Sequence, residues 1–252
     1  MKNFFKQFSA SIKAYSQAFS FINQHKLWHY FLFPILVSLV LAVITFYIRS
    51  MVVEATQAWF LDFLGYESWW PFLQKITGWA IHTTLFLASW YFYFKFQKYI
   101  VFIVLSPVLA YISEKVEEKI MGTTYPFNLS QFIKDIIRGV RIALGNIFKE
   151  VFVTLLLLLV TILIPLLSPV TTVLSLLIAW YYYGYAFIDY TSERKKRSIK
   201  ESNTFISQRK GLAIGNGMVF ELLFWIPILG FIFAPILAVT AATISVAEEE
   251  EY

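Results

Sequence analysis

The sequence predicts an all-α integral membrane protein with two long transmembrane helices, two helical hairpins that enter the bilayer only partway, and amphipathic helices at the interface. Of its 252 residues, 58% are apolar and 15% are charged, whereas a soluble domain carries about 25% charged residues. The charges gather between long uncharged segments, which have the length of membrane-spanning helices. Two later apolar segments contain proline near their centres, as helical hairpins would.

Residues 1–26 are expected to form an amphipathic helix on the inner surface of the membrane. Their apolar residues recur at roughly helical spacing and lie among lysines, which is typical of helices that rest in the membrane interface. The apolar positions are Phe4, Phe5, Phe8, Ile12, Tyr15 and Phe19.

The first transmembrane helix is predicted at 27–48. This segment has 22 residues without Asp, Glu, Lys or Arg, and a helix of that length spans about 33 Å, more than the roughly 30 Å hydrocarbon core. The mixed segment 50–75 is predicted to be an external interfacial loop with one short amphipathic helix. A long second transmembrane helix is predicted at 76–105, where Lys95 and Lys98 lie among tyrosines at one membrane face.

The segment 128–149 is predicted to be an amphipathic helix with a basic face. Its apolar residues alternate with Lys134, Arg138 and Arg141. The two hairpins are predicted to follow, at 151–188 and 211–247. Their tips contain the helix breakers Pro165, Pro169, Pro227, Gly230 and Pro235, and Pro235 is expected to begin the second arm of the second hairpin.

The hairpins are expected to be re-entrant. The arm 151–164 has 14 residues and reaches only about 21 Å, which is short of the roughly 30 Å core. Neither tip carries a charge, whereas the connector at 50–75 holds several. Backbone groups at such a tip must be buried in protein or face a wet cavity. The alternative is two ordinary short transmembrane pairs with tight turns.

A weak internal repeat relates the two hairpins. The residues Ala-Leu-Gly-Asn at 143–146 are followed 70 positions later by Ala-Ile-Gly-Asn at 213–216. Glu150 and Glu221 fall almost in step with this offset. Chance similarity between apolar segments remains an alternative explanation.

Basic residues cluster at 2–26, 95–149 and 194–210 and are scarce in 50–75. Because cytoplasmic loops are enriched in Lys and Arg, both termini are predicted to be cytoplasmic. The net charge of +5 is attributed to these loops, so we expect membrane lipids and not nucleic acid as the partner.

Three stretches of the chain resemble the CysZ sulfate permease and etoposide-induced-protein family. They are HKLWHYFLFPILV at 25–37, SPVLAYISEKVEEKIMG at 106–122, and GYAFIDY at 184–190 followed by RKGLAIGNGMVFELLFWIPILGFIFAPILAVTAATISV at 209–246. The resemblance implies two long helices plus two partly penetrating hairpins, assembly as a homo-oligomer, and sulfate uptake across the bacterial inner membrane for cysteine synthesis. The sulfate or a related oxyanion would be the transported partner.

The resemblance also implies a binding site before the first span, where bacterial sulfate permeases of this family carry Gly-Leu-Arg-Arg. The matching residues here are Lys26, Leu27, Trp28 and His29, so the leucine is kept and both arginines are replaced. Free N–H groups at a helix start, with Lys26 or a protonated His29, could still hold an anion. Lys26 and Trp28 would equally suit a plain interfacial anchor.

Four charged residues are further candidates for the transport path. Glu150 and Glu221 lie near the start of a hairpin arm, where a carboxylate either complements the helix dipole or couples an ion. Arg138 and Arg141 are three residues apart and could face sulfate or a lipid head group. Gly215 and Gly217 are expected to allow close approach of helices.

No enzyme motif is found, so neither catalysis nor a cofactor or metal is expected. The chain has no cysteine, which excludes thiolate catalysis and cysteine-ligated zinc. Two functions remain open: an anion permease, and a non-transporting membrane scaffold of the same family.

Overall fold

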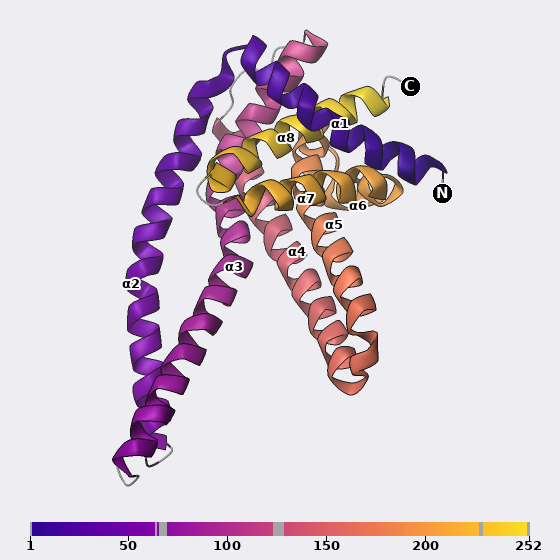
Figure 1. The fold of residues 1–252 in the computed structure, drawn as a ribbon. Helices are drawn as coiled ribbons and strands as arrows, with labels where there is room; N and C mark the ends of the chain where they lie inside the picture. Colours follow the sequence, from indigo (N-terminus) through magenta and orange to yellow (C-terminus); the bar gives the residue numbers. More distant parts are fainter. Residues whose placement is uncertain (1, 64, 66–69, 123–128, 227–228, 251–252) are drawn as a thin grey trace. The chain divides into compact units, whose positions relative to one another are not determined.

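The structure is a computed structural model, and it describes residues 2–63, 65, 70–122, 129–226 and 229–250. Every element in these ranges is a helix, which confirms the all-α prediction for them (Figure 1). The elements are α1 (Lys2–Gln24), η1 (Leu27–Phe31), α2 (Leu32–Phe63), α3 (Pro71–Met121), α4 (Leu129–Leu163), η3 (Pro165–Leu167), α5 (Ser168–Arg194), α6 (Ile199–Gln208), α7 (Lys210–Phe224) and α8 (Leu229–Glu250).

Four helical segments among the described residues are long and apolar enough to cross a membrane. They are Leu27–Phe63, Leu129–Leu163, Pro165–Arg194 and Leu229–Glu250. The helix lengths and the composition are therefore those of a multi-pass membrane protein. How deeply each hairpin enters the bilayer stays a prediction.

The chain forms two compact units. One unit, here called the core unit, comprises residues 1–35 and 102–252, and the other comprises residues 36–101. The second unit is built from most of α2 and the first part of α3. The apolar side chains that the structure describes in this unit are largely exposed, with Leu36 and Leu39 each 60% exposed, so they present a surface suited to lipid.

The long helices extend past their predicted ends. The first transmembrane helix was expected to stop at Ile48, but α2 continues to Phe63 because no glycine or proline interrupts this stretch. The second was expected at 76–105, but α3 runs from Pro71 to Met121 with Pro107 inside it. Gly122 then ends α3 in the left-handed conformation (φ 67°), which glycine adopts without strain.

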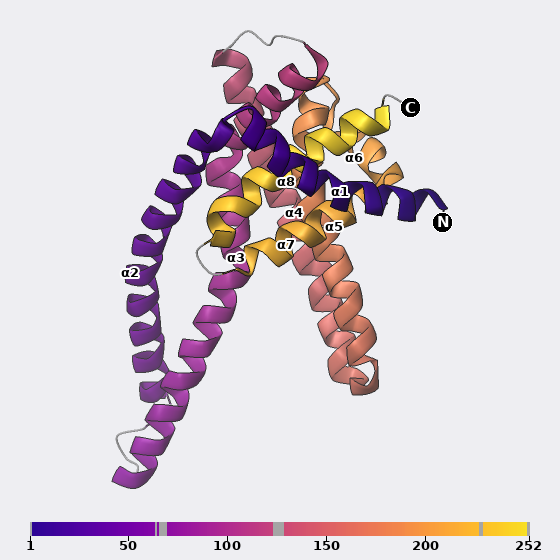
Figure 2. The ribbon, with the colours of Figure 1, turned by 45° about the horizontal axis from the view of Figure 1, so that its top comes forward.

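The predicted amphipathic helix and the first arm of the first hairpin are one continuous helix. The sequence predicts a boundary between 128–149 and 151–164, where charge gives way to apolar residues, but α4 passes through it without a break. A change in polarity does not interrupt backbone hydrogen bonding, and no helix breaker lies between Lys149 and Val151. α4 and α5 pack side by side as the first hairpin (Figures 1 and 2).

The turns of the hairpins fall close to the predicted residues. Pro165 begins η3, and Pro169 lies in the first turn of α5, where its missing N–H costs no hydrogen bond. Pro227 lies outside the described residues. The structure places Gly230 and Pro235 inside α8, so the expectation that Pro235 begins the second arm is wrong. α8 passes through Pro235 because a proline inside a membrane helix is tolerated where neighbouring groups satisfy the freed backbone carbonyl.

The centre of the core unit is formed by α8, packed against α1, α5 and α7 (Figures 1 and 2). The side chains that α8 buries are mostly small, among them Ala234, Ala238, Ala241 and Ala242, all with no exposed surface. Small residues let helices approach closely. The tip of the first hairpin is the opposite case, because Leu163 and Leu166 are 71% and 87% exposed.

Glycines on two faces of α7 allow two neighbouring helices to contact its backbone. A Cβ on Gly217 would lie 1.8 Å from the carbonyl oxygen of Trp180 in α5. On another face, a Cβ on Gly215 would lie 2.9 Å from the carbonyl oxygen of Phe8 in α1. The prediction that Gly215 and Gly217 permit close helix approach is confirmed.

Candidate functional site

The candidate site is a group of charged side chains in the core unit, around the turn between α5 and α6. Lys196 adopts the left-handed conformation (φ 54°) just after α5. The Arg197 N–H donates to the Ser192 carbonyl at 3.0 Å, and the Lys196 N–H donates to the Glu193 carbonyl at 2.8 Å. These two bonds form a Schellman motif, which closes the C-terminus of α5.

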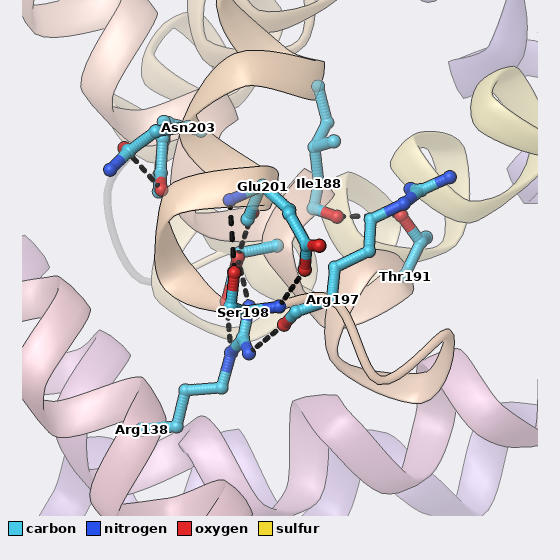
Figure 3. A network of polar contacts seen from close by, with 10 residues as sticks. Arg138, Ile188, Thr191, Arg197, Ser198, Glu201 and Asn203 are labelled. Atoms are coloured by element: carbon cyan, nitrogen blue, oxygen red, sulfur yellow. Dashed lines mark hydrogen bonds and ion pairs between the residues drawn. The ribbon is translucent and has the colours of Figure 1, made fainter.

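The next helix begins immediately after this turn. Ser198 is the N-cap of α6 and forms a capping box with Glu201 (Figure 3). The Ser198 N–H donates to the Glu201 carboxylate at 2.7 Å, and the Glu201 N–H donates to the Ser198 hydroxyl at 3.2 Å. The Ser198 N–H and, to a smaller extent, the Ser198 hydroxyl stabilise the charged Glu201 carboxylate by hydrogen bonds, and this lowers the pKa of Glu201. Residues 195–198 are thus held in one conformation by hydrogen bonds on both sides.

Arg138 of α4 binds this turn through two contacts. Its guanidinium forms a bidentate pair with Asp189 of α5, with N–O distances of 3.0 and 3.1 Å. It also donates to the backbone carbonyl of Arg197, while the Arg197 side chain points away from it (Figure 3). Asp189 is buried and also accepts a hydrogen bond from Ser202 of α6. Arg138 therefore joins α4, α5 and α6 at a single carboxylate.

Arg194 joins the end of α5 to α3 and α8. Its guanidinium pairs with the buried Glu117 and donates to the Ser113 hydroxyl at 2.6 Å. The Ser113 hydroxyl in turn lies 2.6 Å from the Thr243 hydroxyl of α8. This chain of contacts ties the charged end of α3 to the helix at the centre of the core unit.

The C-terminal turn of α8 carries three glutamates that bind different parts of the core unit. Glu248 and Glu249 accept hydrogen bonds from Gln17 and Gln7 of α1, at 2.7 and 3.2 Å. Glu250 forms ion pairs with Lys195 and with Arg197, the latter at 2.8 Å. Glu248, Glu249 and Glu250 are thus an ordered part of the fold.

Two guanidinium groups stack on Phe205 of α6. The guanidinium carbons of Arg197 and Arg209 lie 3.9 and 4.0 Å from its ring centroid, as in cation–π contacts. Burial lowers the pKa of Arg197, and the neighbouring Arg209 lowers it further. Burial likewise lowers the pKa of Lys195. We call Arg194, Lys195, Arg197 and Arg209 the basic cluster.

A second polar site lies where α4, α5 and α7 meet. Glu150 has no exposed surface and Glu221 is 8% exposed. Both carboxylates act on the buried Tyr183 of α5, and Glu150 interacts with its hydroxyl. Asn146, one helical turn before Glu150, is also buried. The two glutamates that the internal repeat singled out are therefore brought together around one tyrosine.

The four residues before the first span form a turn between α1 and α2. Lys26 is exposed and adopts the left-handed conformation (φ 55°), and Leu27 is buried. The Trp28 ring contacts Phe19, Phe31 and Phe233, with centroids 5.8, 5.3 and 6.5 Å away. His29 is exposed, and its Nδ1 lies 3.3 Å from the Lys26 carbonyl oxygen.

The predicted pair Arg138 and Arg141 is separated by the structure. Arg138 is engaged with Asp189, whereas Arg141 is exposed on α4. Sequence reasoning missed Glu117, Glu250 and Arg209 as members of the charged site. Glu117 lies in the mixed-charge run 114–119 and Glu250 in an acidic run, so nothing in the sequence distinguishes the carboxylate that joins this site from its neighbours. In the described residues, no group of three or more His, Cys, Asp or Glu side chains could hold a metal ion.

Comparison with known families gives one match. Residues 14–235 match the family model described as sulfate transporter CysZ/etoposide-induced protein 2.4. A comparison with curated proteins gives no match.

Proposed function

We propose that the chain is an anion permease that takes up sulfate, because it belongs to the family of the sulfate transporter CysZ and etoposide-induced protein 2.4. The single observation that carries this proposal is the family match, which extends over residues 14–235 and so includes the basic cluster and the two glutamates around Tyr183. The resemblance noted from three separate stretches of sequence supports it. The proposed setting is the inner membrane of a bacterium, with both termini in the cytoplasm and the chain assembled as a homo-oligomer.

The charges of the core unit suit an oxyanion. The turn between α5 and α6 concentrates guanidinium and ammonium groups, and guanidinium binds sulfate or phosphate oxygens through paired donors. In the proposal, this turn attracts the anion on the cytoplasmic side. Glu150 and Glu221 are proposed to couple a cation or proton to the anion, because ionisable groups buried among membrane helices commonly mark ion pathways.

Uptake of labelled sulfate into proteoliposomes tests the proposal. The purified chain is expected to give sulfate entry above that of protein-free vesicles made from the same lipid. A Glu150→Gln, Glu221→Gln double variant is expected to slow entry at least tenfold. A Glu54→Gln, Asp62→Asn double variant on α2, at exposed positions outside the core unit, serves as a charge-matched control. Uptake equal to that of empty vesicles would refute the permease function.

The second candidate function is a non-transporting membrane scaffold. It is favoured by Trp28 and His29, which stand where the sulfate permeases that this chain resembles carry two arginines. The aromatic contacts of Trp28 with Phe19, Phe31 and Phe233 suit an interfacial anchor. A scaffold would show no flux, and crosslinking in native membranes would instead recover a defined membrane-protein partner.

A further inference from the structure

The contacts of Glu250 show how the basic cluster already binds an anionic group. One oxygen of its carboxylate pairs with the Lys195 ammonium and the other lies 2.8 Å from the Arg197 guanidinium. A carboxylate held between an ammonium and a guanidinium has the same charge and the same acceptor geometry as one edge of a sulfate or phosphate group. Glu250 thus stands where two oxygens of a tetrahedral oxyanion would bind.

The basic cluster has donors left over beyond those that Glu250 uses. Among the described residues, Nη1 of Arg197, Nε of Arg209 and Nη2 of Arg194 are buried and have no hydrogen-bond acceptor. Buried polar groups are normally paired, so the unmatched donors of Arg197 and Arg209 indicate a place for further acceptor oxygens. A carboxylate has two oxygens, whereas sulfate and phosphate have four.

The charge balance favours a divalent ligand. Lys195, Arg197 and Arg209 bring three positive charges, and Glu250 is the carboxylate that pairs with two of them. Glu117 pairs with Arg194, although its charge also acts on Lys195. The Glu201 carboxylate accepts from the Ser198 N–H in the capping box, although its charge also acts on Arg197. The stacking of Arg197 and Arg209 on Phe205 fixes both guanidinium planes before any ligand arrives.

We propose that Lys195, Arg197 and Arg209 form a binding site for a tetrahedral oxyanion, and that Glu250 is a tethered competitor that occupies part of this site. Glu250 lies in the last turn of α8, and terminal turns of helices open at little cost. When this turn opens, the site binds the free anion. When it closes, the carboxylate displaces the anion. The site is independent of the proposed transport, because it binds without any flux.

Equilibrium binding of labelled sulfate to the full chain in detergent micelles, at constant ionic strength, tests the proposal. A competitor that is closed in about nine molecules of ten lowers the apparent affinity about tenfold. Glu250→Gln is therefore expected to tighten sulfate binding about tenfold. Glu249→Gln removes the same charge from the adjacent residue, which binds Gln7, and is expected to change the affinity less than twofold.

Two further variants show where the gain arises. Lys195→Gln and Arg197→Gln, each combined with Glu250→Gln, are expected to abolish the gain. Lys195 is the safer test of the two, because its side chain is 29% exposed and does not stack on Phe205. Equal effects of Glu250→Gln and Glu249→Gln, or a gain that survives the loss of Lys195, would overturn the proposal.

The tetrahedral oxyanion that binds this site is either a free anion or the phosphate of a lipid. Nanodiscs of phosphatidylcholine with and without phosphatidic acid distinguish the two sources in the Glu250→Gln variant. Sulfate binding that weakens when phosphatidic acid is present assigns the site to a lipid phosphate, and unchanged sulfate binding assigns it to a free oxyanion. Absence of sulfate binding in both nanodiscs contradicts the site itself, whatever the transport assay shows.

Discussion

At the scale of single residues, Asp189 is the acceptor on which three helices depend. It is 3% exposed, forms a bidentate pair with Arg138 of α4 and accepts from Ser202 of α6. Removing one partner of a buried ion pair leaves the other charge uncompensated, at a cost of about 3–5 kcal/mol. We therefore expect Asp189→Asn to lower the free energy of unfolding by about that amount, measured by denaturation in detergent. Asp62→Asn, at an exposed position of α2, is the control and should have no measurable effect.

Glu201 gives a prediction for the effect of pH on α6. Its pKa is lowered from an ordinary value of 4.5 by hydrogen bonds from Ser198. A carboxyl with a depressed folded-state pKa stabilises the fold above its unfolded pKa, and this contribution is lost as the pH falls through the folded value. The stability difference between the wild type and Glu201→Gln should thus shrink below pH 4.5, as followed by thermal unfolding. A difference that stays constant from pH 7 to pH 3 would contradict this role.

Single residues differ in how far the sequence could predict them. Glu150 and Glu221 were found through the internal repeat, and the structure brings both to Tyr183. The pair of Arg138 with Asp189 joins residues 51 positions apart. No local pattern encodes such a contact, because it depends on how α4 packs against α5. The role of Lys26, Leu27, Trp28 and His29 in anion binding stays a prediction.

At the scale of helices, the crossing of α5 and α7 depends on the absence of side chains at two glycines. A Cβ on Gly184 or on Gly217 would lie 1.8 Å from a carbonyl oxygen of the facing helix. Because neither backbone can move without disturbing the core, Gly217→Ala is expected to destabilise the protein by about 3 kcal/mol, as overpacking does.

Gly145 provides a matched control for that substitution. It lies inside α4, and a Cβ there would meet nothing within 4 Å. Gly145→Ala should therefore stabilise α4 by about 0.5–1 kcal/mol, since alanine loses less backbone entropy in a helix. Thermal unfolding of both variants in the same detergent decides the matter, and similar destabilisation by both would contradict the packing account.

The positions of most helices could be predicted from the sequence, whereas several of their ends could not. Long uncharged runs and proline tips indicated the helices that became α2, α4, α5, α7 and α8. The boundary placed near Lys149 was misplaced because a shift from amphipathic to apolar character changes what a helix contacts and not its backbone. The prediction that Pro235 begins a helix is wrong for another reason, since a proline is tolerated inside a helix when surrounding helices pack against it.

At the scale of the whole molecule, the four membrane-span candidates among the described residues divide into three that are largely exposed and one that is largely buried. The hairpin of α4 and α5 exposes large apolar residues such as Phe148 and Leu163, 73% and 71% exposed. α8 is comparably apolar, yet most of it is buried within the core unit. Hydropathy alone cannot separate these cases. The alanines of α8 were the available signal, because small residues mark helix–helix contacts in membranes.

The predicted re-entry of the first hairpin can be tested with single cysteines, because the chain has none of its own. Leu166→Cys places a thiol at a strongly exposed position of the first tip, since Leu166 is 87% exposed. A membrane-impermeant maleimide added outside intact cells should leave it unlabelled if the tip stops within the bilayer. Trp70→Cys, in the connector predicted to be external and 78% exposed, should label readily. Equal labelling of both would mean that the hairpin crosses fully.

Competition in sulfate uptake tests the permease account most directly. Proteoliposomes containing the wild-type chain should take up labelled sulfate at a rate that saturates and exceeds that of protein-free vesicles. Excess unlabelled sulfate should suppress this rate, whereas chloride at the same ionic strength should leave it unchanged. A rate no greater than that of protein-free vesicles, or one that chloride and sulfate reduce equally, would contradict the account.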